Sequence, residues 1–245
     1  MSIKEIFPNP TVKQVIFQIR FNPIFYLELK MGDFQMAIIK KFPESSLIVR
    51  SPIRIPDTQK PDEELFPSTK LWQFKSVNGD ILNVEFNSVS LVSEHYKTYQ
   101  LGEGEKFRDL IKFVTDAFID IMKIPIIKRI GLRYIDDNCP FPSRNESEFN
   151  SYYNTATPIN RFNLESITES FVTVIVKKED CSLRYIERIS QENGKDKFTL
   201  DFDGFSTDID ATEYLNVSDK LHTVISEEYE KTLKEPVYKI MRENR

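Results

Sequence analysis

The chain has 245 residues, of which 40% are hydrophobic and 29% charged, a composition typical of a folded globular protein. Its net charge of −5 and pI of about 5.3 exclude a generally basic nucleic-acid-binding protein but allow a local basic groove. The two cysteines, Cys139 and Cys181, do not suggest a disulfide framework, so we expect a reducing, cytoplasmic compartment. We expect neither a signal peptide nor a membrane span, because no apolar run approaches about 18 residues.

The first hundred residues predict one helix among several strands. Apolar and polar side chains alternate from Val12 to Phe21, which predicts a strand with one apolar face. A short helix is expected to open at Gly32 and to end before Pro43. Asn78-Gly79, between two apolar segments, predicts a hairpin. The expected strands are 12–21, 47–55, 71–77, 81–86 and 89–96, with an exposed loop at 56–67.

The rest of the chain contains the clearest helix signal. From Glu105 to Met122 the apolar residues recur every three or four positions, which predicts a helix with one buried face. Polar residues from 138 to about 161 predict a loop. Ser218 is expected to cap the N-terminus of a final helix. The expected strands of this part are 126–136, 171–177, 181–190 and 197–205.

These elements predict the α+β class. We expect an antiparallel-rich sheet, built of two meanders, packed against the long central helix and a C-terminal helix. The chain should form a single unit over 1–245, and its division into two similar halves, 1–100 and 101–245, is left open. The tetrapeptide Leu-Arg-Tyr-Ile occurs at 132–135 and at 183–186. Four residues recur easily in alternating strands, so this repeat does not establish a duplication.

Four arginines lie in predicted strands beside apolar or aromatic residues. Neighbours in a strand point to opposite faces, so these arginines would share the face opposite the core, with Gly131 leaving room between two of them. Guanidinium groups pair well with phosphate oxygens, which makes a candidate phosphate or nucleic-acid-backbone site of Arg20, Arg129, Arg133 and Arg184. The alternative, and the commoner situation on a sheet face, is a ladder of ion pairs with carboxylates such as Glu187, Asp201 or Glu85.

Acidic residues cluster in the segment 201–210. Asp201 and Asp203 would project from one face and could hold a divalent cation, but the spacing departs from the calcium-loop pattern, and a turn at a solvated strand end is favoured. The histidines, His95 and His222, and the two cysteines lack the paired spacing of a zinc site. The sequence has no phosphate loop, dinucleotide-binding glycine motif or nucleophile elbow. We therefore predict no metal, no cofactor and no catalytic residue.

Several segments together resemble a known family. In order, they are Asn9-Pro10-Thr11-Val12, Val15-Ile16-Phe17-Gln18-Ile19-Arg20-Phe21, Phe42-Pro43, Trp72-Gln73-Phe74, Ile130-Gly131-Leu132-Arg133-Tyr134-Ile135 and Leu221-His222. The chain thus resembles, over nearly its whole length, a sporadically distributed prokaryotic family of similar length without an established function. The resemblance implies a single unit and no particular activity. As a class, the chain is also similar to the analogue-of-PAZ partner subunits of short prokaryotic Argonautes, which are sheet-rich, non-catalytic and contact nucleic acid.

These observations favour a non-catalytic binding subunit that contacts a protein partner and also a nucleic-acid backbone, within a prokaryotic antiviral defence system. The first alternative is a divalent-cation-dependent enzyme that uses Asp201 and Asp203. The second is a purely structural protein-interaction module. Trp72 could stack on bases, but packing in the core is the favoured interpretation.

Overall fold

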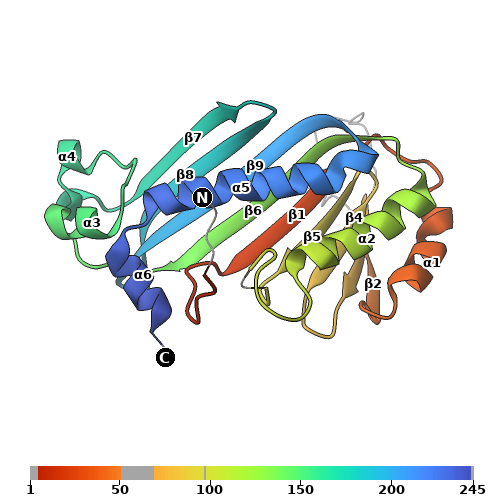
Figure 1. Ribbon diagram of the computed structural model, residues 1–245, viewed down its shortest axis with the longest axis horizontal. Coiled ribbons are helices and arrows are strands. Elements are labelled where there is room, and N and C mark those ends of the chain that lie inside the picture. The colour runs from red at the N-terminus through yellow and green to blue at the C-terminus, as the bar shows by residue number, and fades with distance from the viewer. Residues whose placement is uncertain (1–4, 51–68, 97, 244–245) are drawn as a thin grey trace, which may run out of the picture.

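The structure is a computed structural model and describes residues 5–50, 69–96 and 98–243. Within these ranges, nine strands form one antiparallel sheet in the order β2-β3-β4-β5-β1-β6-β9-β8-β7 (Figure 1). The strands are β1 (Gln14–Arg20), β2 (Glu44–Arg50), β3 (Thr69–Lys75), β4 (Ile81–Glu85), β5 (Ser88–Ser93), β6 (Ile126–Cys139), β7 (Ser170–Lys178), β8 (Cys181–Glu192) and β9 (Lys195–Asp210). The helices are α1 (Leu27–Ile38), α2 (Phe107–Met122), α3 (Glu146–Tyr152), α4 (Ile159–Phe162), α5 (Tyr214–Thr232) and α6 (Glu235–Arg242).

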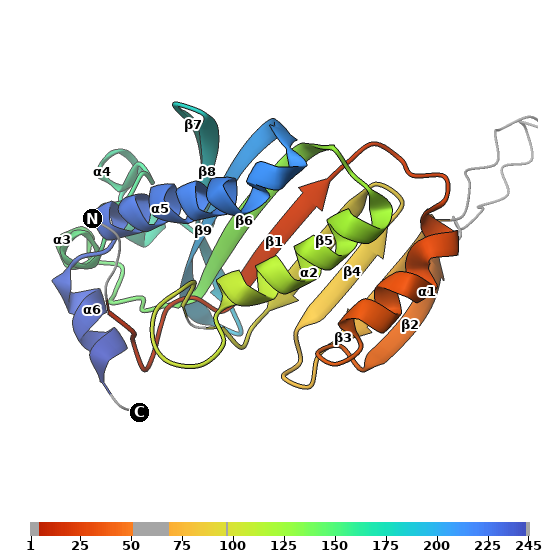
Figure 2. The same cartoon turned by 45° about the vertical axis from the view of Figure 1, so that its right-hand side comes forward.

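The molecule has two layers. Helices α1, α2 and α5 lie side by side along one face of the sheet, as Figures 1 and 2 show from two directions. None of these three helices packs on the other side, which we call the open face. The α+β class predicted from the sequence is confirmed by this single antiparallel sheet with its helices.

The hydrophobic core fills the space between the helices and the sheet. Phe17 and Leu132 point into it from the two central strands, and Phe118 does so from α2. The predicted apolar stripe of α2 is buried except for the half-buried Ile121; its buried members are Phe107, Leu110, Ile111, Val114, Phe118 and Met122. Alternation in β1 and β6 therefore sends one set of side chains into the core and the other set to the open face.

The strand order repeats on the two sides of the central β1–β6 pair. On one side β5, β4 and β3 follow, and α2 comes after them in the chain. On the other side β9, β8 and β7 follow, and α5 comes next. In the β1–β6 pair, Gln18 lies opposite Gly131, with Phe17 opposite Leu132 and Ile19 opposite Ile130. The description of the chain as two similar halves stays a prediction.

Two helix starts differ from the sequence-based prediction. Helix α1 begins at Leu27, ahead of the expected Gly32, because its buried stripe consists of Leu27, Met31, Phe34 and Ile38. Helix α5 begins at Tyr214, not at Ser218. The Ser218 hydroxyl donates to the Tyr214 carbonyl one turn back, a bond that an interior helical serine can make.

The segment predicted as a polar loop contains two short helices. Asn145 caps α3, because its side-chain oxygen accepts a hydrogen bond from the Glu148 amide at 3.0 Å. The second expected strand occupies 44–50, not 47–55; its remaining predicted residues and the predicted loop at 56–67 lie outside the described residues. Over the ranges that the structure covers, no helix has both the length and the apolar character needed to cross a membrane.

Candidate functional site

The strand geometry brings the four candidate arginines to the open face. Their strand neighbours that point into the core are almost fully buried: Ile19, Ile130, Leu132 and Leu183. Arg20 on β1 lies opposite Arg129 on β6. Arg133 on β6 and Arg184 on β8 both lie opposite Asp203 of β9, from its two sides. We call the four arginines, with Asp201 and Asp203, the arginine array.

The two Leu-Arg-Tyr-Ile segments flank one stretch of β9 in the same register. In both, the leucine pairs with Gly204, the arginine with Asp203, the tyrosine with Phe202 and the isoleucine with Asp201. Both β6 and β8 are antiparallel to β9, so they run parallel to each other on its two sides. The repeated tetrapeptide therefore supplies two strands with the same chemistry to one acidic segment.

The two aspartates of the array accept hydrogen bonds from its arginines. Arg133 donates from Nε at 2.8 Å and also from Nη2 to the two oxygens of Asp201. Arg129 Nη2 lies 3.0 and 3.1 Å from the oxygens of Asp203, and Arg184 Nη1 lies 3.8 Å from the same carboxylate. Asp201 and Asp203 are buried, and a buried carboxylate needs such compensation. The array thus contains an ion-pair ladder.

Gly131 leaves room for the path of the Arg129 side chain. A Cβ at position 131 would lie 2.6 Å from Nη1 of Arg129, well inside van der Waals contact. The guanidinium therefore passes over Gly131 on its way to Asp203, and its Cζ lies 4.9 Å from the centre of the Phe205 ring. Guanidinium and ring together form a flat, partly exposed surface beside the ladder.

The array keeps unused positive charge. Four arginines against two aspartates give it an excess of two positive charges. Arg20 is exposed and donates to the Gln18 side chain at 2.9 Å; among the described residues no carboxylate lies within ion-pair distance of it. The side chains of Arg133 and Arg184 remain 42% and 44% exposed despite their aspartate contacts. Their free N–H groups can therefore reach an anion above the sheet.

The sequence predicted Glu85, Glu187 and Asp201 as ladder partners, and of these three only Asp201 accepts hydrogen bonds from an arginine. Glu85 accepts a hydrogen bond from Ser88 at 3.1 Å. Glu187 points to the helix side, where it is completely buried and accepts hydrogen bonds from residues 155–157. Glu187 is three residues from Arg184, so strand alternation already predicts that the two side chains lie on opposite faces of β8. The loop residues that bond Glu187 are distant in the sequence, and alternation does not identify them.

The interpretation of the acidic cluster as a turn at a strand end is wrong. β9 continues to Asp210, so Asp201 and Asp203 lie within it, between β6 and β8. Asp208 instead forms an ion pair with Lys128. No group of three or more His, Cys, Asp or Glu residues in the described part of the chain could hold a metal ion. The arginines already engage both carboxylates that a divalent cation would need.

The remaining candidates lie away from the array. Trp72 pairs with the buried Val84 and packs against the core from the helix side, so it offers no stacking surface next to the arginines. His222 lies in α5, with its ring stacked on Tyr99. Cys139 and Cys181 are both free thiols.

Sequence reasoning missed an exposed apolar stripe on α1 and the turn before it, which we call the α1 stripe. Leu29 and Met36 on α1 and Phe25 in the preceding turn point away from the core and are 85%, 69% and 92% exposed. The opposite side of the same helix is buried against α2 and the sheet. The sequence did contain a signal for this surface, because α1 has apolar residues on two sides and a helix needs only one apolar side to pack against the core.

The arginine array is thus a charged surface on the sheet face that α1, α2 and α5 leave free, and the α1 stripe is an apolar surface on the helix side. Neither contains a nucleophile with an adjacent base or a set of free metal ligands among the described residues. Both have the chemistry of binding surfaces. In comparisons with family models and with curated proteins, nothing matches this chain.

Proposed function

We propose that this protein is a non-catalytic binding subunit that contacts a nucleic-acid backbone with its open sheet face and a protein partner with α1. The observation that carries the proposal is the arginine array, with its excess of two positive charges on a chain of net charge −5. A local cluster of arginines can bind phosphates in spite of an overall negative charge. Guanidinium groups that hold an aspartate on one edge retain donors on the other edge for phosphate oxygens.

The width of the array suits an extended backbone. The arginines lie on β1, β6 and β8, so a single strand crossing the sheet would meet them in turn. The Phe205 ring beneath Arg129 adds a surface on which a base can stack. The ladder fixes the orientation of Arg129 and Arg133 before binding, which lowers the entropy lost when phosphate binds.

The protein partner is assigned to the α1 stripe. Leu29 and Met36 on one face of α1, with Phe25 in the turn before it, are large exposed apolar side chains that are costly in water unless they are covered. Phe86, 6.2 Å from Phe25 between ring centres, widens the same surface. A purely structural interaction module would bind its partner through the α1 stripe and would not bind nucleic acid through the arginine array. Separate tests of the two surfaces therefore distinguish this alternative from the proposal.

The proposed setting is the prokaryotic cytoplasm, in an antiviral defence system. Free cysteines, one of them buried, suit a reducing compartment. The resemblance to the partner subunits of short prokaryotic Argonautes agrees with a binding role and stays a prediction.

Arg20→Ala is expected to weaken binding of a fluorescein-labelled oligo(dT) by about threefold to tenfold, because one charge-assisted contact is lost. Fluorescence anisotropy between about 50 and 200 mM salt should give a log–log slope that is shallower by about 0.7 than that of the wild type. Arg20 is the cleanest probe, since its removal leaves Asp201 and Asp203 paired.

Arg161→Ala is the matched control. It removes the same charge from α4, outside the array, where Arg161 stacks on Phe162. Equal losses in the two variants would mean that only net charge matters. Wild-type protein without salt-dependent binding would show the nucleic-acid part of the proposal to be wrong.

Leu29→Glu is expected to abolish retention of the protein partner in pull-downs from the native host, with little change in the melting temperature, because Leu29 contributes almost nothing to the core. Ala37→Glu, an equal charge change at another exposed position of α1, should retain the partner. If both variants retain the same proteins as the wild type, α1 is not the interface.

A further inference from the structure

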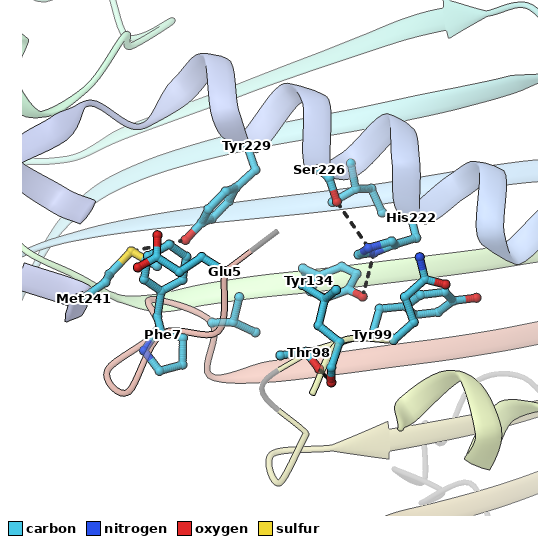
Figure 3. A pocket seen from close by; sticks show the side chains of 14 residues that line it. Glu5, Phe7, Thr98, Tyr99, Tyr134, His222, Ser226, Tyr229 and Met241 are labelled. Carbon is cyan, nitrogen blue, oxygen red and sulfur yellow. Dashed lines mark hydrogen bonds between the residues drawn. The ribbon is translucent and has the colours of Figure 1, made fainter. Parts of the chain in front are cut away.

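A pocket lies on the helix side of the sheet, away from both proposed surfaces. It is bounded by the N-terminal segment with Phe7 and Val12, by the chain after β5 at 98–101, and by α5 with His222 and Ser226 (Figure 3). Its enclosed volume is about 90 Å³, and it opens to solvent, so it can enclose one ring of a ligand whose remainder lies in the mouth. Aromatic and aliphatic side chains form most of the wall, as in small-molecule sites.

Three polar groups meet in this apolar wall. The His222 ring lies between two hydroxyls: Nδ1 is 3.2 Å from Tyr134 Oη, and Nε2 is 3.4 Å from Ser226 Oγ (Figure 3). A phenol can make one hydrogen bond as donor and two as acceptor, and among the described residues His222 is the only side chain bonded to the Tyr134 hydroxyl. The Ser226 contact is long for a hydrogen bond. Both hydroxyls can therefore bond a further group in the pocket.

Among the described residues, the pocket offers no free charge. Burial lowers the pKa of His222 to about 4, against the smaller opposing effect of Asp219, so its ring is neutral at pH 7. Asp219 is itself held by two hydrogen bonds from Arg108 and one from Tyr99. At the rim, Arg242 binds Glu5. A charged ligand would lose its hydration without gaining a partner, which favours an uncharged one.

The wall has a flat section. The rings of Tyr99 and His222 stack at 4.3 Å with an angle of 17° between them, and Tyr134 lies beside them. We propose that the pocket binds an uncharged aromatic heterocycle of one or two rings, whose polar edge hydrogen-bonds to the hydroxyls of Tyr134 and Ser226. The flat apolar lining takes the ring faces, and the two hydroxyls select for ring nitrogen atoms at the edge.

Isothermal titration calorimetry on the full chain at pH 8 tests this with benzimidazole, which is uncharged there. Indene, its hydrocarbon counterpart in shape, and benzoate, an anion, are the comparison probes. Benzimidazole is expected to bind saturably and more tightly than either. No saturable binding of benzimidazole, or equal binding of benzoate, would overturn the proposal.

Two variants locate the site. Tyr134→Phe should weaken benzimidazole binding about threefold to tenfold and leave indene unaffected, because one hydrogen bond is lost at nearly constant shape. Tyr152→Phe, at a partly buried tyrosine outside the pocket, is the matched control and should bind like the wild type. Leu101→Trp fills the pocket from the loop and should abolish binding while the melting temperature stays near that of the wild type. Unchanged binding in both pocket variants would place benzimidazole elsewhere and contradict the proposal.

Discussion

Glu187→Ala is expected to lower the free energy of unfolding by about 3–5 kcal/mol. The completely buried carboxylate accepts hydrogen bonds from the hydroxyls of Thr155 and Thr157 at 2.6 and 2.7 Å, and from the amides of Ala156 and Thr157 at 2.8 and 2.9 Å. The Tyr185 hydroxyl donates a further bond to it. Alanine would take this acceptor away from all of these donors, including those of the buried Thr157 and Tyr185, and the loss of a buried hydrogen bond is costly in a low-dielectric interior.

Urea denaturation followed by circular dichroism measures this loss. Native-state hydrogen exchange should in addition show the amides of Ala156 and Thr157 exchanging faster, because both donate to Glu187 of β8. Glu192→Ala is the control on the same strand: its carboxylate is exposed and pairs with Lys197 at the surface, so its effect should stay within about 0.5 kcal/mol. A Glu187→Ala protein as stable as the control would contradict the structural role given to this carboxylate.

Asp136→Asn is expected to stabilise the protein at pH 8, and the gain should disappear as the pH falls toward 4. Burial raises the pKa of Asp136 to about 7, although the Thr11 hydrogen bond acts in the other direction. Its Oδ2 has no hydrogen-bond partner among the described residues. Tyr229 shares the Thr11 hydroxyl, and the charge of Asp201 raises the pKa further.

The sign of the effect follows from linkage. The folded-state pKa lies above the unfolded value of 3.8, so Asp136 costs stability above pH 7 and this cost is relieved between pH 7 and 4. A shift of this size corresponds to roughly 4 kcal/mol at most. His222 acts oppositely in the same window, because its folded pKa is lowered to about 4 and protonation disfavours the folded state. The difference between wild type and Asp136→Asn isolates the carboxyl.

Asp137→Asn is the matched control, one residue along on the open side of the sheet. Burial raises the pKa of Asp137, but hydrogen bonds and charge from Lys197 outweigh it, and the pKa is lowered overall. This variant should therefore lose stability at neutral pH and approach the wild type in acid. Melting temperatures of the three proteins at pH 4 to 8 check both signs; parallel curves for Asp136→Asn and the wild type would mean that Asp136 does not titrate in this range.

The sequence by itself determined what is local. Alternation in β1 and β6 was enough to place the arginines opposite the core, because the period of a strand is two residues wherever it pairs. The spacing of apolar residues in α2 likewise predicted a helix with one buried face. Single residues typical of helix starts were less informative. Gly32 and Ser218 predicted the first residues of two helices, but both lie inside helices whose buried apolar positions begin earlier in the chain.

Only the tertiary structure decided which groups meet. β9 comes between β6 and β8, although β8 precedes it in the chain, and this order sets Asp203 between Arg133 and Arg184. Arg133 bonds Asp201, and Glu187 bonds the loop at 155–157. Both contacts depend on the register between segments that are distant in the sequence. The pocket beside His222 likewise forms where the N-terminal segment meets α5. Local patterns fix the face on which a side chain lies, whereas its partner depends on strand order and register, which the burial of the whole sheet selects.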